Sequence, residues 1–446
     1  MIVKEINTTL ESFDIYSIFK DEKNIAFLDS AMDAENLGRY SFIGVNPFTV
    51  LKGRNNQCYI DNKQYQCDVF DKLSELLKKY KAENTTKIPL VGGCIGYFSY
   101  DLVDHVMSEE KVQEGFVIPH YYFIFYDNMI IFDHKSGKKY ISACGILNNQ
   151  EQSIALLKEK IAAQKKVKYK KINENSLVIT SNFTKDQYLK TISQVKEYIR
   201  SGDIYIANLT QRFAAQSDKD SYEIYRDLRK INPAPFAAFM RFQDFDIISS
   251  SPERFLKVQD HFVETRPIKG TRQRGCNELE DEQNRNELLN SDKDKAELLM
   301  IVDLERNDLS KVCKPHSVKV TELFKLEEYS TVFHLVSTVI GQLKNDIDAV
   351  RCMKECFPGG SITGAPKIRA MEIIKELEKI KRSIYTGCIG YFSFDGNADF
   401  NIVIRTIIKK DQQVYFGAGG GITWDSDQEA EYQETLDKAK ALVKVI

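Results

Sequence analysis

Residues 251–271 read SPERFLKVQDHFVETRPIKGT. Apolar residues recur along this stretch in the alternating manner of a strand; they include Phe255, Val258, Phe262 and Val263. The stretch ends at a Lys269-Gly270-Thr271 corner, where glycine permits a tight backbone turn that other residues resist. We therefore expect Lys269 at the end of a strand, facing a pocket.

Lys269 has two interpretations. A solvated lysine in a turn is the commoner one, because lysine is rarely buried. A lysine amine that is desolvated can instead act as a nucleophile near neutral pH. Glu253, which lies upstream on the same run, could then be its acid/base partner. These residues alone leave both interpretations open.

The composition describes a soluble globular protein. Of the 446 residues, 43% are hydrophobic and 28% are charged, enough for one large domain or two or three ordinary ones. The formal net charge of -2 gives no electrostatic case for nucleic acid or an anionic membrane as a partner. The N-terminus lacks the apolar core of a signal peptide, and no run approaches a membrane span. Nine cysteines, an odd number, fit a reducing cytoplasm better than a disulfide framework.

A basic run divides the chain. Residues 158–171 hold seven lysines and continue a helical pattern. Such a run could contact RNA, but a solvated helix end followed by a linker is the favoured interpretation. We therefore place an N-terminal lobe at residues 1–170 and a C-terminal lobe at residues 180–446.

Strand patterns and helical patterns fall in separate runs. Strands are expected at 118–143, 235–268, 316–326, 385–408 and 413–424. Helices are expected at 70–80, 150–163, 185–200, 219–230, 281–309, 346–356, 366–380 and 427–445. Without a strict alternation of strand and helix, this order favours an α+β fold.

One segment occurs twice. Residues 93–101 and 387–395 differ only at Tyr100 and Phe394, and both alternate small and aromatic residues as strands deep in a packed sheet do. Since one copy falls in each lobe, we expect equivalent positions in two sheets that share a core.

Several long motifs follow one another in a fixed order over roughly residues 180–446. They are SPERF at 251–255, PIKGT at 267–271, IVDL at 301–304 with RND at 306–308, FPGGSITGAPK at 357–367 and the glycine-rich run 417–421. Together they resemble the chorismate-utilising enzymes. The resemblance implies large, mostly antiparallel sheets packed as a two-lobed sandwich with helices outside. It also implies an N-terminal lobe like that of anthranilate synthase component I and an active site in the C-terminal lobe.

Lys269 selects a branch of this family. Anthranilate synthases, which aminate chorismate at C2, carry alanine there, so the lysine implies the branch that aminates C4 and forms 4-amino-4-deoxychorismate, a precursor of para-aminobenzoate and folate. In this branch Lys269 and Glu253 are the expected catalytic residues. Anthranilate synthesis is the alternative. The resemblance implies that relatives which form isochorismate use a lysine base at the position of Gln211, so we do not expect this chain to activate water.

Two helices supply carboxylates for a metal. Asp294 and Glu297 are three residues apart and share a helix face, as do Glu431 and Glu434. Mg²⁺ prefers oxygen ligands and commonly takes one or two carboxylates. By themselves these pairs could be solvated helix charges. The resemblance implies that Glu297 and Glu434 bind Mg²⁺, with Asp294 and Glu431 as their support.

Chorismate, the substrate that the resemblance implies, is a dicarboxylate and needs hydrogen-bond donors for its carboxylates. Residues 417–421 follow the strand 414–416, and backbone N–H groups without side chains can hold an anion. Arg405 interrupts an apolar strand and could grip a carboxylate with two hydrogen bonds. The resemblance implies a substrate site made by Gly270, Thr271, His334, Tyr385, Arg405, Gly419, Gly420, Gly421 and Lys438.

Ammonia must come from elsewhere. Cys94 has the spacing of a Gly-x-Cys-x-Gly nucleophile elbow, but no histidine is followed two places on by Glu or Asp, as in glutamine amidotransferases. We therefore expect a separate glutamine amidotransferase subunit as a partner, or ammonia from solution.

A second ligand is possible in the N-terminal lobe. Segments near Asp29 and Pro235 resemble those that form the tryptophan pocket of relatives, with Asp29 in place of a glutamate of anthranilate synthases. The implied pocket residues are Ser30, Arg39, Tyr40, Pro235 and Phe236. A non-catalytic amino-acid sensor is the corresponding alternative from another functional class.

Overall fold

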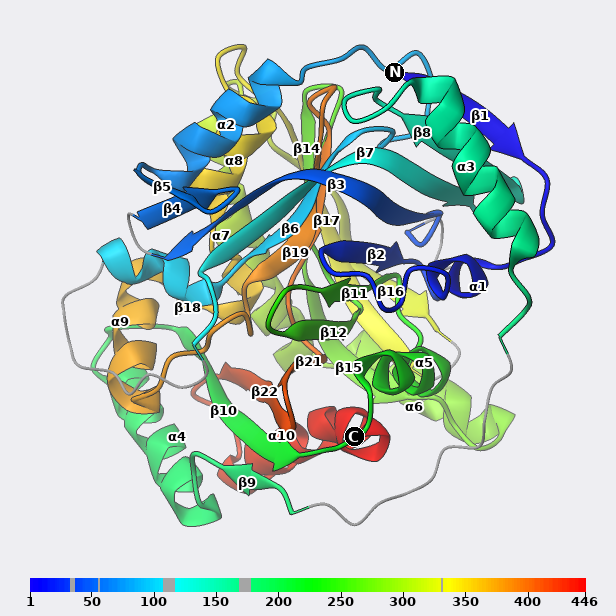
Figure 1. The fold of residues 1–446 in the computed structure, drawn as a ribbon. Coiled ribbons are helices and arrows are strands. Elements are labelled where there is room, and N and C mark those ends of the chain that lie inside the picture. Colours follow the sequence, from blue (N-terminus) through cyan, green and yellow to red (C-terminus); the bar gives the residue numbers. More distant parts are fainter. Residues whose placement is uncertain (33–36, 55–56, 107–116, 168–177, 330–331) are drawn as a thin grey trace.

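The computed structural model describes residues 1–32, 37–54, 57–106, 117–167, 178–329 and 332–446. Strands and helices form separate runs, and every strand ladder between the described residues is antiparallel, so the α+β expectation is confirmed. The chain forms one body in which the strands lie centrally and most helices lie outside (Figure 1).

The described residues of the first lobe form eight strands and a few helices. The strands are β1 (Ile2–Ile6), β2 (Ile25–Asp29), β3 (Tyr40–Arg54), β4 (Gln57–Ile60), β5 (Lys63–Gln66), β6 (Gly93–Phe98), β7 (Tyr121–Asp133) and β8 (Lys138–Ala143). The helices are α1 (Ser12–Tyr16), α2 (Val69–Lys79), the 3-10 helix η1 (Tyr100–Val106) and α3 (Gln150–Ala163).

The second lobe holds the remaining elements. Its strands are β9 (Thr180–Ser181), β10 (Ile206–Gln216), β11 (Phe236–Arg241), β12 (Asp246–Ser251), β13 (Arg254–Gln259), β14 (Phe262–Arg266), β15 (Ile268–Gln273), β16 (Lys319–Glu328), β17 (Val332–Gln342), β18 (Gly364–Ala365), β19 (Cys388–Ser393), β20 (Ala398–Asn401), β21 (Thr406–Lys410) and β22 (Gln413–Ile422). Its helices are α4 (Lys185–Arg200), α5 (Ser221–Ile231), α6 (Glu278–Asn290), α7 (Asp292–Val312), α8 (Ala349–Cys356), the 3-10 helix η2 (Gly360–Ile362), α9 (Lys367–Glu378) and α10 (Gln428–Val445).

The repeated segment joins the two lobes. β6 and β19, which carry its two copies, pair directly with each other in an antiparallel ladder with Gly96 opposite Gly390. The expectation that the copies occupy separate sheets is therefore wrong. Neither glycine could carry a side chain, because a Cβ at Gly96 would lie 2.1 Å from the Tyr122 carbonyl oxygen and one at Gly390 would lie 2.0 Å from that of Asp399. β2 and β11 form a second ladder between the lobes.

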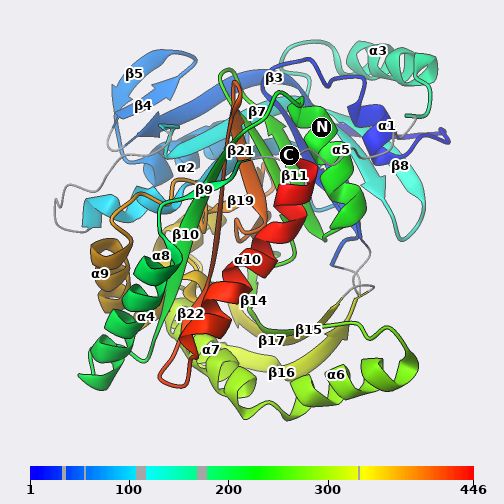
Figure 2. The ribbon, with the colours of Figure 1, turned by 90° about the horizontal axis from the view of Figure 1, so that it is seen from below.

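Helices of the second lobe frame one region of the sheet. α10 packs on β22, α9 packs on β10, and α7 packs on β15 and β17. Figure 2 shows α10 running obliquely across this side of the molecule with α7 beside its far end. Apolar residues of α10, such as Leu442 and Val445, are buried in a cluster with Phe416 of β22, and this packing fixes the polar side chains on the same helix over the strand.

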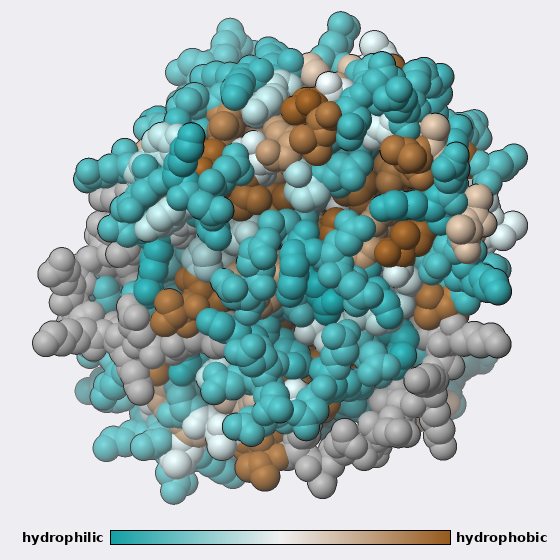
Figure 3. Space-filling view, viewed as in Figure 1, coloured by the Kyte–Doolittle hydropathy of each residue, from teal (hydrophilic) through white to brown (hydrophobic). Residues whose placement is uncertain are grey.

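The surface is polar over most of the face seen in Figure 3, where apolar side chains gather only in small separate patches. None of the helices in the described residues is long and apolar enough to cross a membrane. Both observations agree with the polar composition of the chain.

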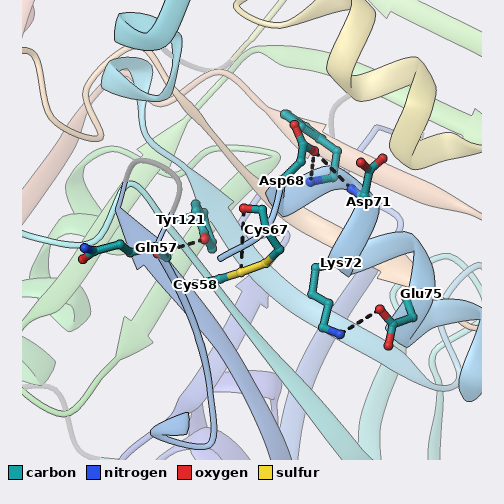
Figure 4. The surroundings of a disulfide bond; sticks show 9 residues. Gln57, Cys58, Cys67, Asp68, Asp71, Lys72, Glu75 and Tyr121 are labelled. Atoms are coloured by element: carbon teal, nitrogen blue, oxygen red, sulfur yellow. Dashed lines mark hydrogen bonds and ion pairs between the residues drawn. A yellow bond between two sulfur atoms is a disulfide. The ribbon is translucent and has the colours of Figure 1, made fainter. Parts of the chain in front are cut away.

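Two cysteines depart from the expectation of free thiols. Cys58 on β4 and Cys67 just after β5 form a disulfide, with their Cα atoms 6.3 Å apart (Figure 4). The β4–β5 hairpin brings them together, since Cys58 lies opposite Tyr65 in that ladder. The other seven cysteines are free.

Candidate active site

Lys269 is the second residue of β15 and lies at an irregularity within the strand rather than at a corner. β15 pairs with β17 on both sides of a register shift between Lys269 and Thr271, and Gly270 between them has a φ of 75°. This is a β-bulge, which re-aims side chains locally and favours glycine at a positive φ. The Lys269 amine donates a hydrogen bond of 3.3 Å to the Ser361 carbonyl oxygen and forms no ion pair with any described residue.

Glu253 is a buried carboxyl with one oxygen that lacks a partner. It follows the end of β12, where its backbone carbonyl accepts from Ile402 N–H at 3.0 Å. Its Oε1 atom is enclosed and has no hydrogen-bond partner among the described residues, and the same holds for the nearby Ser361 hydroxyl. Burial raises the pKa of Glu253, against the opposing influence of Ser361 and the charge of Lys269. A raised pKa favours the protonated form, which is the form that a general acid needs.

The glycines of β22 form an edge around which the site is built. Gly417–Gly421 continue the strand and pair with β10 on one side, whereas β21 pairs with β22 only as far as Phe416. A Cβ at Gly420 would lie 3.2 Å from Glu431 Oε2, and one at Gly421 would lie 3.3 Å from Lys269 Nζ. The absent side chains therefore let the amine and the carboxylates approach the open edge of this strand.

Carboxylates from two helices converge on this edge. Burial, together with the charges of Glu431 and Asp294, raises the pKa of Glu297 to about 7 against the opposing charges of Lys269 and Lys293. Burial and the neighbouring Glu434 likewise raise the pKa of Glu431. Like-charged groups that disfavour each other's ionisation in this way form a site that a cation would stabilise.

The remaining contacts decide which carboxylates are available. Partial burial acts to raise the pKa of Glu434, but Lys438, 2.5 Å away, outweighs it and holds that pKa below its usual value. Glu431 accepts from Ser426 at 2.7 Å and pairs with Lys293 at 3.3 Å. Asp294 pairs with Arg272 at 3.1 Å. Glu297 forms no ion pair with any described residue.

No group of three or more His, Cys, Asp or Glu side chains within the described ranges is close enough to hold a metal together. Mg²⁺ does not need such a group, because it commonly binds through one or two carboxylates and keeps the other positions for water and substrate oxygens. Glu297 has no ion-pair partner among the described residues, and Glu434 is more exposed. The charge of Lys269 lowers the pKa of both carboxyls, and both fit this pattern of oxygen donors.

Thr271 and His334 lie opposite each other on β15 and β17 and share a hydrogen bond of 2.9 Å between Thr271 Oγ1 and His334 Nδ1. Burial lowers the pKa of His334 to about 4, and the nearby Arg405 charge contributes. The imidazole is therefore neutral at physiological pH, with Nδ1 engaged by the Thr271 hydroxyl.

Arg405 is a guanidinium without a carboxylate partner among the described residues. It stands just before β21 with a φ of 51°, and burial lowers its pKa, partly offset by Tyr385 and Glu434 nearby. Tyr385 packs its ring against Gly417, where a Cβ would lie 2.4 Å from it. An unpaired guanidinium beside a tyrosine hydroxyl is suited to binding a carboxylate of a ligand.

The structure thus brings most of the predicted substrate and metal residues into one site. Lys438 donates to the Gly419 carbonyl oxygen at 2.8 Å, so it both pairs with Glu434 and closes the glycine edge. Gly270 supports the bulge: a Cβ there would lie 2.7 Å from Leu288 Cδ1 and 3.0 Å from Asp294.

Gln211, expected at the position of a lysine base in isochorismate-forming relatives, does not lie beside the Lys269 amine. It lies on the far face of β10 from the amine, where it donates to Thr435 Oγ1 at 2.5 Å and accepts from Ser181 at 2.7 Å. The residue of β10 beside the amine is Ile206, whose Cδ1 lies 3.0 Å from the position of a Gly421 Cβ. The two residues are five positions apart, so strand alternation places them on opposite faces.

Glu305 is a buried carboxyl that the sequence interpretation missed. It is on α7, accepts from Thr265 Oγ1 at 2.7 Å, and lies under Gly360, whose Cβ would be 3.3 Å from its Cγ. Burial raises its pKa to about 8, and the charge of Glu253 adds to the effect. Because Glu305 lies in a stretch of helix-forming residues, nothing in the sequence indicated that its carboxyl is buried.

A separate cavity of about 320 Å³ lies between the lobes. All five residues of the expected second pocket line it, namely Ser30, Arg39, Tyr40, Pro235 and Phe236. Arg39 is held by Asp133 through hydrogen bonds of 3.0 and 2.8 Å. Asp29 is buried and engaged by Tyr225 at 3.0 Å and Arg229 at 2.9 Å.

Comparisons with known proteins agree with this site. The family model for chorismate binding enzymes matches residues 24–444. Anthranilate synthase component 1 of Acetivibrio thermocellus is 37% identical over 468 residues, covering 100% of this chain and 94% of that protein. Aminodeoxychorismate synthase component 1 of Bacillus subtilis (strain 168) is 35% identical over 450 residues, covering 98% and 94%. The crystal structure of anthranilate synthase component I from Streptococcus pneumoniae TIGR4 superposes with a TM-score of 0.82 at 32% identity, covering 91% of this chain and 92% of that one.

The chain therefore belongs to the family of chorismate binding enzymes. Its relatives include enzymes named for two different products, and similarity alone does not separate them, since the identities differ by only a few per cent.

Proposed function

We propose that this protein is an aminodeoxychorismate synthase component I, which converts chorismate and ammonia to 4-amino-4-deoxychorismate in the cytoplasm. The observation that carries the proposal is the Lys269 amine. It lies at the glycine edge with a single hydrogen bond to a backbone carbonyl and with no ion pair to a described carboxylate, so its lone pair is accessible when the amine is neutral.

The reaction begins with attack by the neutral Lys269 amine on C2 of chorismate. Both ring double bonds shift by one position, the C4–O bond breaks, and the protonated Glu253 gives its proton to the departing hydroxyl, which leaves as water. The burial that raises the pKa of Glu253 keeps that proton available. Lysine is now bound to C2 as a secondary ammonium.

Ammonia then adds at C4. Both ring double bonds shift back, the C2–N bond breaks, and Lys269 leaves as a neutral amine. The Glu253 carboxylate takes a proton from the new ammonium group and is ready for another cycle. Because C2 is occupied by lysine when ammonia arrives, the amino group is directed to C4.

The substrate carboxylates have two binding regions. Arg405, with Tyr385 beside it, is placed for one of them. Glu297 and Glu434 would hold Mg²⁺ for the other, supported by Asp294 and Glu431, and this ion would neutralise the carboxylate charge. Neutral His334, fixed by Thr271, can donate or accept one hydrogen bond at the ring.

We propose a separate glutamine amidotransferase subunit as the ammonia source. Cys94, the thiol with the spacing of a nucleophile elbow, is buried in β6, and burial raises its pKa strongly, so it cannot supply a thiolate. The cavity between the lobes is proposed to bind tryptophan, since it has the rings of Tyr40 and Phe236 and the charged Arg39.

The second candidate is anthranilate synthase component I, which the identities to relatives support equally well. One incubation separates the two. The purified chain is given chorismate, Mg²⁺ and ammonium, and the products are resolved by chromatography. We expect 4-amino-4-deoxychorismate, and anthranilate as the main product would overturn the proposal. Calorimetric titration with tryptophan tests the second cavity.

A further inference from the structure

Ser361 carries a hydroxyl that the fold does not use. The residue is the middle one of the 3-10 helix η2 and is 5% exposed, and its Oγ is enclosed without a hydrogen-bond partner among the described residues. Burying a hydroxyl without a partner is unfavourable. The hydroxyl of Thr363 is different, because it donates to the carbonyl oxygens of Gly359 at 3.0 Å and Gly360 at 3.2 Å. Of these two hydroxyls, only that of Thr363 holds the loop together.

The enclosed hydroxyl lies next to the carboxyl of Glu253. Burial raises the pKa of Glu253, and among the groups that oppose this shift the Ser361 hydroxyl has the largest effect, through hydrogen bonding. Even so, neither Glu253 Oε1 nor Ser361 Oγ has a hydrogen bond of normal geometry. The two groups are therefore close without being fully bonded. Catalytic hydrogen bonds are often long or poorly aligned before substrate binds, and they tighten during the reaction.

Ser361 also contacts the nucleophile. Its carbonyl oxygen accepts the 3.3 Å hydrogen bond from the Lys269 amine. The next carbonyl oxygen, that of Ile362, accepts from the buried Arg382 at 3.0 Å, so the backbone beside Ser361 is held in place. One fixed residue thus meets the amine through its backbone and Glu253 through its side chain, and a donor that is fixed in advance is effective where charge develops.

We propose that Ser361 is a positioning residue whose hydroxyl donates a hydrogen bond to the carboxylate that Glu253 becomes when it gives its proton to the departing C4 hydroxyl. The bond strengthens as the charge develops, so it stabilises the transition state more than the bound substrate. The serine keeps its own proton throughout. After ammonia has added at C4, Glu253 takes a proton from the new ammonium group and the bond weakens again. The proposal rests on the proposed function, because it concerns that proton transfer.

Other charged groups act on the same carboxyl. The charges of Lys269 on β15 and Lys438 on α10 lower the pKa of Glu253. Burial raises the pKa of Glu305 on α7 to about 8, so this neighbour is mostly neutral below that value. A substitution that removes only the Ser361 hydroxyl leaves these groups in place. A comparison of variants below about pH 8 therefore reports on the hydroxyl.

Ser361→Ala and Thr363→Val are a matched pair, because each removes one enclosed hydroxyl from the same loop. The full chain is titrated without substrate, and infrared spectroscopy follows the carbonyl band of protonated Glu253, which is identified by its absence in Glu253→Gln. We expect this band to persist to higher pH in Ser361→Ala than in the wild type and to be unmoved in Thr363→Val. Turnover of chorismate with Mg²⁺ and ammonium should fall about tenfold in Ser361→Ala.

Thermal unfolding separates this role from a structural one. Ser361→Ala should melt no lower than the wild type, because it removes a buried donor that has no partner, whereas Thr363→Val should melt lower. An unmoved band, or turnover equal to that of the wild type, in Ser361→Ala would overturn the role of Ser361. If Ser361→Ala does not fold, judged by circular dichroism, Ser361→Cys takes its place with the same expectations, since a thiol is a weak donor.

The two proposals fail in different ways. The infrared titration uses no substrate, so its result does not depend on which product the enzyme forms. Anthranilate as the main product, with the band still shifted in Ser361→Ala, would overturn the proposed function. An unmoved band, with 4-amino-4-deoxychorismate as the product, would overturn the role of Ser361 alone.

Discussion

Arg382 and Glu378 form a buried ion pair 2.6 Å long in which both side chains are almost fully enclosed, at 3% and 2% exposure. Arg382 also donates to the carbonyl oxygens of Asn208 at 2.6 Å and Ile362 at 3.0 Å, and Glu378 accepts from Thr210. The pair therefore ties the end of α9 to β10 and to the 3-10 helix η2, which carries Ser361. Arg382 itself lies three residues before Tyr385.

Loss of Glu378 should be costly. Glu378→Ala leaves a buried guanidinium without its counter-charge, and we expect the free energy of unfolding to fall by roughly 3–5 kcal/mol. Glu372→Ala is the matched control, since Glu372 lies on the same helix and its pair with Arg369 is exposed; we expect a change below about 1 kcal/mol. Urea unfolding measures both, and similar midpoints would show that the buried pair is not needed.

Lys269→Met tests the nucleophile. Methionine keeps much of the side-chain volume and removes the amine, so formation of 4-amino-4-deoxychorismate should fall by orders of magnitude. Lys269→Arg should not restore it, because a guanidinium stays protonated and cannot attack. Turnover is followed by chromatography. Near wild-type rates in Lys269→Met would leave Lys269 as a residue of the bulge only.

Glu297→Gln and Glu434→Gln test the metal site. Each removes a charged oxygen donor, so we expect loss of turnover and a weaker dependence on Mg²⁺. Binding of Mg²⁺ to the protein, measured by calorimetry without substrate, gives a second readout. Glu429→Gln, at an exposed position on α10 that pairs with Lys185, is the control. An unchanged magnesium titration in both site variants would place the metal elsewhere.

Glu305 predicts a pH dependence of stability. Its pKa is about 8 in the folded protein and near 4.5 when exposed, so the folded state binds the extra proton between these values. Stability from this group is complete below about pH 4.5 and is lost as the pH rises through 8. We expect the thermal midpoint of the wild type to fall more between pH 5 and about 9 than that of Glu305→Gln. Parallel curves would contradict the buried, protonated state.

The isolated chain should use ammonium and not glutamine. Cys94 is enclosed in β6, so no thiolate is available to attack the glutamine amide. We expect product from chorismate with ammonium salts and none with glutamine. Robust amination with glutamine by the pure chain would contradict this prediction, and Cys94→Ser would then show whether that thiol is responsible.

Helix positions could be predicted because their signals are local. The expected helices at 150–163 and 185–200 coincide with α3 and α4, and α4 begins with a capping box between Thr184 and Gln187. The stretch 281–309 was expected as one helix. It divides at Ser291, which ends α6 and whose hydroxyl accepts from Asp294 N–H at the start of α7. A serine inside a polar helical pattern gives little warning of such a break.

Strand partners and strand faces could not be predicted in the same way. β3 and β10 were not anticipated, because β3 contains Pro47 and two glycines and β10 has few clear alternations. Without β10 there was no basis for deciding that Ile206, and not Gln211, faces the amine. Glu305 was missed for a related reason, since only the packing of α7 against β14 shows that its carboxyl is enclosed.

The direct pairing of β6 with β19 has a consequence during synthesis of the chain. β6 emerges early, whereas its partner β19 is made only after most of the second lobe, so one edge of β6 stays open in the meantime. The sequence that satisfies this edge is nearly the same as that of β6 itself. Two incomplete chains can therefore pair through their β6 edges in the manner of a domain swap. Fragments that end before residue 387 should form such dimers, because the strand that covers this edge of β6 is missing from them.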